Sequence, residues 1–434
     1  PFSSGEYNVA VGYQALAGFT TAGKCVAIGY GAGKAHQTAA WSVYIGYEAG
    51  NDVTTGAQNV LIGGDAGAKI TTADRNIAIG GAAMQSGTGG ENVMVGDNAG
   101  WSATTASGSV FIGRLAAGSL TTGNDNIAIG RDALNGTAVT GDSNIAVGVS
   151  ALDAQVTGNN CIAIGNNAVS NVNSSNIIGI GAYAAHNGFG TGTTAIGYYA
   201  GYYSQTANNT FVGYESGKGT GAAGYGNSTA LGYQALTTLT TGDDNTAVGY
   251  QAGDVIETGA QNTFVGSGAD GNGTAATNQI AIGYNVTGLG DNYAVIGNAD
   301  VTRLYVASDG AGVLYANGTI QTSDKRLKEN IEDTDLGLDF INKLRPVKYN
   351  YIKDKQDGKA KYGIIAQEVQ EVLKESNNED FAGIKDGDEY LGADYNQFIA
   401  PLIKSVQELS TENKQLKDKI NDLEIFIMDK LGDK

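Results

Sequence analysis

A short motif that ends in glycine recurs along the first 297 residues and limits what this part of the chain can fold into. The stretch from Asn245 to Ala252 is representative: an Asn, the three-residue run Thr-Ala-Val, a Gly, a Tyr, a Gln and then an Ala. The closing glycines are usually seventeen residues apart, at Gly12, Gly29, Gly46, Gly63, Gly80, Gly96, Gly113, Gly130, Gly148, Gly165, Gly181, Gly197, Gly213, Gly232, Gly249, Gly266, Gly283 and Gly297. Eighteen copies predict an array of equal units that are stable only through their neighbours.

Each copy alternates in a way that is typical of a β-strand. The residue before the glycine is always aliphatic, and the residue two places earlier is Val, Ile or Thr in all but the last copy, so both share one face. The other face carries small residues, with Tyr44, Met94, Phe111, Phe211 and Phe264 as exceptions. We expect a five-residue strand, a tight turn, a second extended segment and a polar loop to form one coil of a β-solenoid. Stacking is expected to bury the aliphatic column, with both faces covered.

Composition supports this prediction and excludes several classes of function. The chain has 66 Gly but 3 Pro, and a backbone that pairs with the coils above and below needs its N–H groups. A net charge of −18 argues against nucleic acid or an anionic membrane as partner. No signal peptide opens the sequence and no apolar run has the length of a membrane span, so we expect no membrane insertion.

Few residues of the repeat suggest site chemistry. Cys25 and Cys161 each precede a copy of the motif, which favours a place in the repeat over a disulfide or a metal site. His36 and His186 are far apart and have no repeated partner.

The many Gly-x-Gly pairs lack the strand–helix–strand context of a dinucleotide site. The acidic turns around Asp125 and Asp243 lack the ligand spacing of calcium loops and are typical of turns. We therefore expect no cofactor and no metal.

The runs VAVG, VAIG, IAIG and TAVG, each followed by Ala three residues later, resemble the left-handed β-roll heads of trimeric autotransporter adhesins. Phage tail fibres carry similar repeats. The resemblance implies three chains around a threefold axis, which approach each other closely through their small-residue faces. The adhesin repeat is a few residues shorter, so the loops of this chain are longer.

The composition changes after the repeat. Residues 298–322 read as short alternating strands, which we interpret as a connector. Residues 1–322 hold 8 basic and 20 acidic residues, whereas residues 323–434 hold 18 and 24. We expect four segments: a β-roll at 1–297, the connector, a small α+β domain at 323–400 and a helix at 401–434.

Helices are predicted in the last quarter of the chain. Residues 334–344 have helical spacing with Thr334 as the cap, PVKYNY reads as a strand, and KYGIIAQEVQEVL as a strand that continues into a helix. A heptad seam follows, at Leu402, Val406, Leu409, Asn413, Leu416, Ile420, Leu423 and Ile427. The seam predicts self-association; the alternative is an amphipathic helix that packs on its own domain.

The segment from Thr319 to Ile331 (TIQTSDKRLKENI) resembles the start of the intramolecular chaperone domains that end many phage tail fibres and tailspikes. PVKYNY, YGIIAQEV and LGADYNQFIAPLIKSVQEL match that family in the same order, up to about Leu409. The resemblance implies a domain that trimerises, templates folding of the preceding β-structure and then cuts itself off. It makes Ser323 the nucleophile and Lys328 the general base, with cleavage between Thr322 and Ser323.

A Ser hydroxyl needs a partner to take its proton, and Lys does this only when burial or neighbouring cations lower its pKa. We expect trimerisation to provide that burial. The alternative is that Ser323 caps a helix and Lys328 is solvated.

Together these features predict a mainly β, host-recognising phage tail fibre, made in the host cytoplasm and incorporated into the virion. Its expected partners are two further copies of the chain, the rest of the tail and an unidentified host receptor. Candidate receptor contacts are Trp41, Trp101, Phe189, Tyr202, Tyr203 and the loop at 218–227. Two alternatives remain: a bacterial adhesin head, which calls for a C-terminal membrane anchor, and a capsule-degrading tailspike, which calls for paired carboxylates in a groove.

Overall fold

The structure is a computed structural model that describes residues 5–21, 23–38, 40–154, 157–171, 173–188, 190–221, 224–302, 304, 323–350, 360–386 and 390–432. Unit 1 covers Pro1–Thr302 and unit 2 covers Arg303–Lys434. The predicted strands of the connector lie almost entirely outside the described residues, and the four predicted segment boundaries stay predictions.

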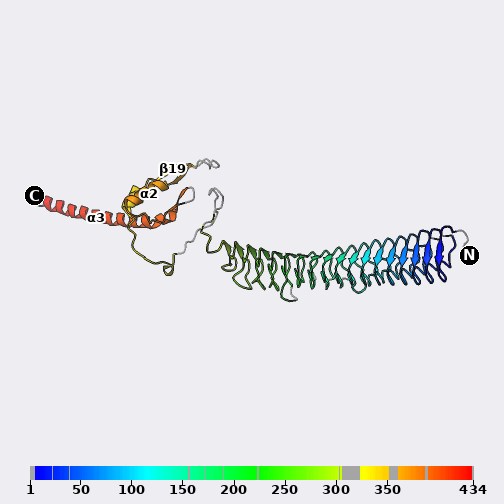
Figure 1. Ribbon diagram of the computed structural model, residues 1–434. Coiled ribbons are helices and arrows are strands. Elements are labelled where there is room, and N and C mark those ends of the chain that lie inside the picture. Colours follow the sequence, from blue (N-terminus) through cyan, green and yellow to red (C-terminus); the bar gives the residue numbers. More distant parts are fainter. Residues whose placement is uncertain are drawn as a thin grey trace. The chain divides into compact units, whose positions relative to one another are not determined.

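Unit 1 is a solenoid of stacked coils, each with one short strand (Figure 1). The strands are β1 (Val9–Val11), β2 (Val26–Ile28), β3 (Val43–Ile45), β4 (Val60–Ile62), β5 (Ile77–Ile79), β6 (Val93–Val95), β7 (Val110–Ile112), β8 (Ile127–Ile129), β9 (Ile145–Val147), β10 (Ile162–Ile164), β11 (Ile178–Ile180), β12 (Thr194–Ile196), β13 (Thr210–Val212), β14 (Thr229–Leu231), β15 (Thr246–Val248), β16 (Thr263–Val265), β17 (Ile280–Ile282) and β18 (Ala294–Ile296). Each strand pairs in parallel with the next, and equivalent residues face each other, as Val9 faces Val26. The predicted β-solenoid of eighteen repeats is confirmed, with strands of three residues instead of five.

A glycine closes each strand because the next coil leaves no room for a side chain. At Gly63 the backbone has φ +133°, and a Cβ would lie 2.4 Å from the carbonyl oxygen of Gly80. The same contact recurs up the column, with a Cβ on Gly80 2.3 Å from the oxygen of Gly96. This close coil-to-coil approach at a positive φ explains why the position is glycine in every copy.

The middle residue of the strand, and not the aliphatic pair, fills the interior. Ala27, Tyr44, Leu61 and their equivalents through β17 are fully buried. The flanking aliphatic residues point outward and stay partly exposed; Ile28, for example, is 39% exposed. Two expectations are therefore wrong: stacking does not bury the aliphatic column, and the small-residue face points into its own coil, where no second chain can approach it.

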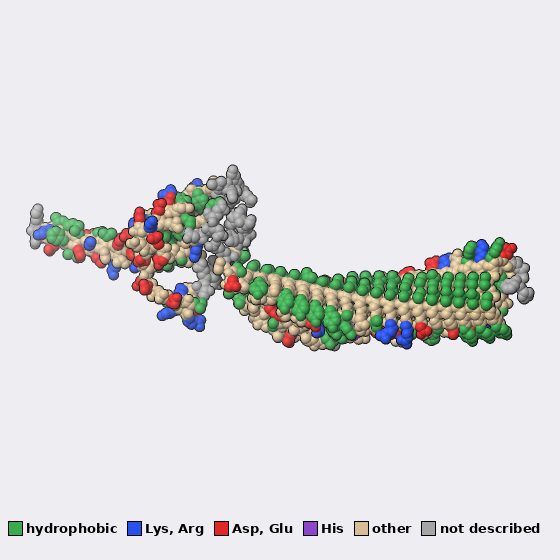
Figure 2. Space-filling view, viewed as in Figure 1, with side chains coloured by type: hydrophobic (Ala, Val, Ile, Leu, Met, Phe, Trp, Pro, Cys, Tyr) green, Lys and Arg blue, Asp and Glu red, His purple; other side chains and the backbone are tan. Residues whose placement is uncertain are grey.

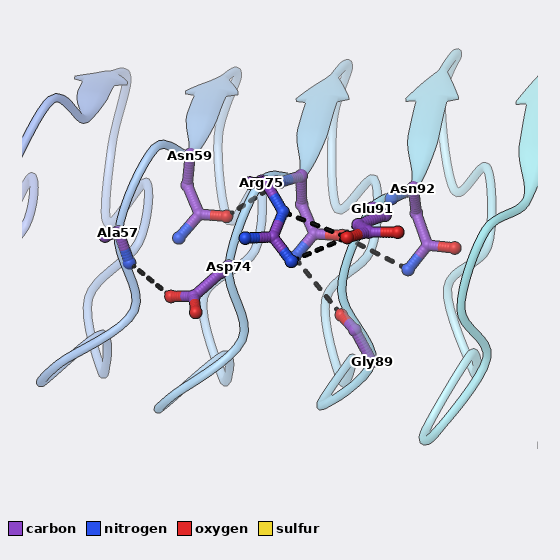
Figure 3. A network of polar contacts seen from close by, with 8 residues as sticks. Ala57, Asn59, Asp74, Arg75, Gly89, Glu91 and Asn92 are labelled. Atoms are coloured by element: carbon purple, nitrogen blue, oxygen red, sulfur yellow. Dashed lines mark hydrogen bonds and ion pairs between the residues drawn. The ribbon is translucent and has the colours of Figure 1, made fainter.

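A ladder of buried amides joins the coils (Figure 3). The backbone N–H of Asn76 donates to Asn59 Oδ1 over 2.9 Å, and that of Asn92 donates to Asn76 Oδ1 over 3.0 Å. In turn, Asn59 Nδ2 donates to the carbonyl of Ala73 and Asn76 Nδ2 to that of Gly89. Each Asn thus satisfies a buried N–H and a buried carbonyl in the next coil, which ties the return loop to the strand.

Unit 2 is a small α+β domain with a long C-terminal helix. Its elements are η1 (Lys325–Leu327), α1 (Leu338–Lys343), β19 (Val347–Tyr349), β20 (Lys361–Gly363), α2 (Ala366–Glu375), β21 (Ile384–Asp386), β22 (Leu391–Ala393), η2 (Tyr395–Phe398) and α3 (Ile399–Gly432). Strands β19 and β20 form an antiparallel pair, as do β21 and β22. The predicted strand at PVKYNY and the strand that leads into a helix at KYGIIAQEVQEVL are confirmed.

The cap of α1 comes from a distant part of the sequence. Thr334 Oγ1 accepts from the N–H of Leu336, outside the helix, so the prediction that it caps the helix is wrong. Glu408 of α3 takes this place: its Oε2 accepts from the N–H of Leu338 over 2.6 Å. A carboxylate suits the first turn of a helix, and this one fixes α3 to α1.

Helix α3 is largely uncovered within the described residues. It packs against α1 and η2 near its start, where Pro401 and Ser405 are buried. From Thr411 to Gly432 every side chain is exposed, including the heptad residues Leu416 and Ile420. The helix therefore does not bury its seam on its own domain. No helix in the described part of the chain is long and apolar enough to cross a membrane.

Candidate functional site

The structure brings the two predicted catalytic side chains together. Lys328 Nζ donates a hydrogen bond to Ser323 Oγ over 2.8 Å. The residues are five positions apart and the turn η1 lies between them, so one tight turn returns the Lys side chain to the Ser. This is the contact that a Ser–Lys pair needs for transfer of the hydroxyl proton.

Asp324 shapes this turn. Its Oδ1 accepts from the N–H of Arg326 and caps η1, and its carboxylate pairs with the Arg326 guanidinium at 2.6 Å. The hydrogen bonds from Arg326 lower the pKa of Asp324 below its ordinary value. Asp324 is the cap of η1, so Ser323 is free of that role and its hydroxyl contacts Lys328.

The pair is open to solvent in the single chain. Ser323 and Lys328 are both exposed. Thr322, on the other side of the predicted cleavage bond, lies outside the described residues. A Lys becomes a general base when burial disfavours its charged form, and the described residues of this chain do not bury the pair. The site is therefore assembled in its contacts but lacks the cover that the chemistry needs.

A second candidate surface runs along unit 1. We call the outward-pointing aliphatic side chains at the first and third strand positions the aliphatic stripe; in β12–β16 the first position is Thr, and only the third belongs to the stripe. In Figure 2 hydrophobic side chains form continuous rows along the solenoid. Fourteen of its members are 36–56% exposed: Val9, Val11, Ile28, Ile77, Ile79, Ile112, Ile129, Ile164, Ile196, Leu231, Val265, Ile280, Ile282 and Ile296. Monomeric proteins rarely expose a continuous apolar surface larger than a few hundred Å². Sequence reasoning missed this surface because it placed the same residues inside the coils.

The candidate receptor contacts have different surroundings. Trp41 is 60% exposed, with Lys24 Nζ 4.0 Å from its ring centroid. Trp101 donates from Nε1 to Gln85 Oε1 over 2.7 Å. Tyr202 and Tyr203 pack edge to face with ring centroids 4.5 Å apart. Phe189 and residues 222–223 of the predicted loop lie outside the described residues.

The described residues contain no group of three or more His, Cys, Asp or Glu side chains that could hold a metal ion. Asp243 Oδ1 accepts from the backbone N–H of Gly226 in the neighbouring coil, which is a role in loop stacking. Cys25 and Cys161 are buried and take the ladder position: their N–H groups donate to Asn8 Oδ1 and Asn144 Oδ1. The prediction that they are repeat residues is confirmed.

One carboxyl pair stands out near the end of the solenoid. Asp270 is buried and hydrogen-bonded to Asp254, and its carboxylate also accepts from the N–H groups of Val255 and Gly271. Burial, together with the contact with Asp254, raises the pKa of Asp270 to about 7. Glycosidase carboxyl groups stand about 5–9.5 Å apart to hold a sugar bond or a water between them. Two directly hydrogen-bonded groups do not have that arrangement.

Residues 323–377 match the model of the chaperone of endosialidase family. The match begins at Ser323, the residue that follows the predicted cleavage bond, and confirms the chaperone resemblance over these residues. No curated protein and no solved structure matches the chain. The solenoid and the chaperone domain together fit a tail-fibre or tailspike-like protein.

Proposed function

We propose that the chain is a structural, host-recognising tail fibre of a bacteriophage, and that its C-terminal unit assembles a homotrimer and is then released by self-cleavage. The protein would be made in the host cytoplasm and carried in the virion, joined to the rest of the tail. The aliphatic stripe carries this proposal, because it runs the length of the solenoid and calls for further copies of the same surface.

Energetic estimates support association through the stripe. Burying the exposed part of one such side chain contributes roughly 0.5–1 kcal/mol, since full burial contributes about 1.5–3 kcal/mol. Fourteen exposed members then contribute roughly 10 kcal/mol per chain. Association costs about 4–15 kcal/mol in lost translation and rotation, so the stripe is sufficient when whole solenoids meet in parallel.

Helix α3, at the C-terminal end of the chain, also supports association of several chains. Leu409, Leu416 and Ile420 recur at heptad spacing and are exposed. Asn413 lies on the same seam, and a polar residue at a core position typically selects register and the number of helices. The number three comes from the resemblance to trimeric β-roll heads and chaperone domains.

The self-cleavage step follows from the contact between Ser323 and Lys328. Once further chains bury the pair, the neutral Lys328 amine takes the hydroxyl proton and Ser323 Oγ attacks the carbonyl carbon of Thr322. The Thr322–Ser323 C–N bond breaks, the Ser323 nitrogen takes a proton, and water hydrolyses the resulting ester. Loss of the chaperone then removes a route to refolding and makes assembly kinetically irreversible.

The test is denaturing electrophoresis with intact mass of freshly expressed protein. Wild type should give two fragments that meet at Thr322 and Ser323, whereas Ser323→Ala and Lys328→Ala should stay whole. Lys325→Ala is the matched control, because Lys325 lies in the same exposed turn and does not bond to Ser323.

An uncut wild-type chain would remove the self-cleavage step. Sedimentation velocity on the uncut Ser323→Ala variant then tests assembly separately. A monomer at micromolar concentration would overturn the role assigned to the aliphatic stripe.

A further inference from the structure

Four rings form a closed patch on two neighbouring coils, those of β11 and β12. Tyr183 and Tyr199 stack with centroids 4.9 Å apart, and His186 and Tyr202 stack at 5.1 Å. The other two sides of the square, Tyr199–Tyr202 and Tyr183–His186, measure 4.8 and 5.4 Å. We call these four residues the aromatic patch. Figure 2 shows a gathering of large hydrophobic side chains on this part of the solenoid.

The fold of the solenoid does not require these rings. Ala184 and Ala200 are fully buried and fill the interior of the two coils. Tyr183 and Tyr199 each stand two residues after the motif glycine and are only half-buried. Most other coils place a polar residue there, among them Gln14, Glu48, Asp65, Asn98, Asp132, Asn167, Glu215, Gln234 and Gln251; the remaining coils have residues such as Gly31, Ala82, Leu115 and Gly268, and none has an aromatic ring. The aromatic patch is therefore a local departure from the repeat, located on the surface.

A backbone carbonyl and an amide side chain hold the β11 side of the patch. His186 Nδ1 lies 3.0 Å from the carbonyl oxygen of Asn167, and His186 Nε2 lies 3.4 Å from Asn171 Nδ2. Asn171 Nδ2 also donates to Asn187 Oδ1 over 2.9 Å. The His ring is thus fixed from both of its nitrogens.

A charged pair holds the other side. Lys218 Nζ lies 5.5 Å from the centroid of the Tyr199 ring and pairs with Glu215 at 2.8 Å. Gln234 Nε2 donates to the other oxygen of Glu215, Oε2. The rings are therefore bordered by amides and by a carboxylate whose charge is matched by a lysine.

We infer that the aromatic patch and its polar border bind a saccharide chain of the host surface. A pyranose ring offers an apolar C–H face to an aromatic ring, while its hydroxyl groups need planar donors and acceptors such as amides and carboxylates. Rings that already contact one another lose little conformational freedom on binding, which favours affinity. This inference deepens the host recognition proposed above and rests on it.

The chemistry of the patch disfavours other partners. None of its four members is aliphatic, so it offers no anchor of the kind that a second copy finds in the aliphatic stripe. Lys218, the Lys or Arg found beside the patch among the described residues, is paired with Glu215, so the patch does not attract a polyanion.

The experiment uses the full chain and two probes: a printed array of oligosaccharides from bacterial O-chains and capsules, and intact cells of the same strains. Wild type should bind at least one array member and label the strain that carries it. Tyr199→Ala and Tyr202→Ala should each weaken saccharide binding about tenfold or more. Tyr30→Ala is the matched control, because Tyr30 stacks between Tyr13 and Tyr47 and is 46% exposed; it should change binding less than twofold.

A measurement on wild type covers the case in which an alanine variant misfolds. Bound saccharide should slow nitration of Tyr199 and Tyr202 by tetranitromethane, mapped by mass spectrometry, and leave Tyr30 unaffected. Unchanged binding in folded patch variants, or nitration without protection, would overturn the inference. Cell labelling without saccharide binding would overturn the inference and leave host recognition standing. A failure to label any strain counts against host recognition itself.

Discussion

The two units differ in the size and arrangement of their hydrophobic cores. Unit 1 repeats one small coil, and its interior is a single continuous cluster from Leu16 to Val286. Unit 2 centres on five buried residues: Leu336, Phe340, Val369, Leu373 and Phe398. A small core of this size rarely stabilises a domain without help. The solenoid completes its interior within one chain. The proposed assembly would supply the partners that the small described core of unit 2 calls for.

The two units also differ in where their unsatisfied apolar surface lies. In unit 1 it is the aliphatic stripe, which lies on the outside of coils whose interior is already filled. In unit 2 it is the free length of α3, a helix with no described core of its own beyond Leu409. Changes inside the coils should therefore damage unit 1 directly, and changes on α3 should act through assembly.

The largest effect is expected from adding one methyl group to the glycine column. In Gly63→Ala the new Cβ meets the Gly80 carbonyl at a positive φ, and only movement of a whole coil relieves the overlap. We expect a loss of roughly 2–5 kcal/mol, from about 1–2 for the backbone and 1–3 for the overlap. Denaturant unfolding followed by circular dichroism measures it.

The adjacent residue is a control within the same coil. A Cβ on Gly64 has no atom within 4 Å, and its φ lies outside the positive range that disfavours side chains. Gly64→Ala should leave stability unchanged or raise it by up to about 1 kcal/mol through the unfolded state. Equal destabilisation by both variants would mean that coil-to-coil contact does not set the glycine column.

The sequence predicts the repeat and the strands because the signal is present eighteen times. The prediction of which strand face lies inside was wrong, because alternation alone shows that a strand has two faces and does not say which one is buried. Hydrophobicity favoured the aliphatic pair, but the middle residue of each strand is the buried one. The interior instead takes one strand residue per coil, and Ala27 shows how little room that is.

The sequence nevertheless contains a signal for which residues are inside: a large side chain at one interior position goes with a small one at another. Where the middle strand residue is a ring, glycines surround it: a Cβ on Gly33 or Gly50 would lie 2.6 Å from the Tyr44 ring. Where it is small, as at Ala78, a large residue such as Met84 fills the space four residues after the motif glycine. Such exchange between two positions identifies both as interior.

The candidate sites were predictable to different degrees. Ser323 and Lys328 belong to a motif with fixed spacing, and a single turn is enough to bring them together. The cap that Glu408 places on α1 joins residues seventy positions apart, so local sequence patterns could not reveal it. For the aromatic patch the sequence singled out Tyr202, but the closed square depends on stacking between coils.

The second prediction concerns α3. In Ile420→Asp a carboxylate replaces an exposed seam residue. Lost burial should cost the assembly about 1.5–3 kcal/mol per chain, so we expect a smaller oligomer fraction by sedimentation velocity and less cleavage before Ser323. Gln415→Asp adds the same charge off the seam and should behave as wild type. A trimer unaffected by Ile420→Asp would show that the stripe of unit 1 assembles the protein alone.

The smallest expected effect is a pH-dependent change in the stability of unit 1. It comes from Asp270, a buried carboxyl group in an interior that otherwise holds mainly neutral side chains. Its position, four residues after the motif glycine, holds glycine or a hydrophobic residue in the earlier coils, such as Leu134 and Gly253. Because burial raises the pKa of Asp270 to about 7, the folded chain keeps this carboxyl protonated where the unfolded chain has already ionised it. The contribution of Asp270 to stability is therefore complete below about pH 4, the ordinary pKa of Asp, and is lost as the pH rises from there towards 7.

Replacing Asp270 by Asn removes the titration and keeps a neutral side chain of the same shape. Between pH 4 and pH 7 the free energy of unfolding of wild type should fall relative to that of Asp270→Asn, measured in guanidinium at one protein concentration. Asp125→Asn, in an exposed turn, controls for the change in net charge and should run parallel to wild type. If wild type and Asp270→Asn run parallel across this range, Asp270 is ionised in the folded coil. The interior of the last coils of unit 1 would then accept a charged carboxylate, as the exposed surface of unit 2 does. The two units would not differ in whether they can hold a charge at this kind of position.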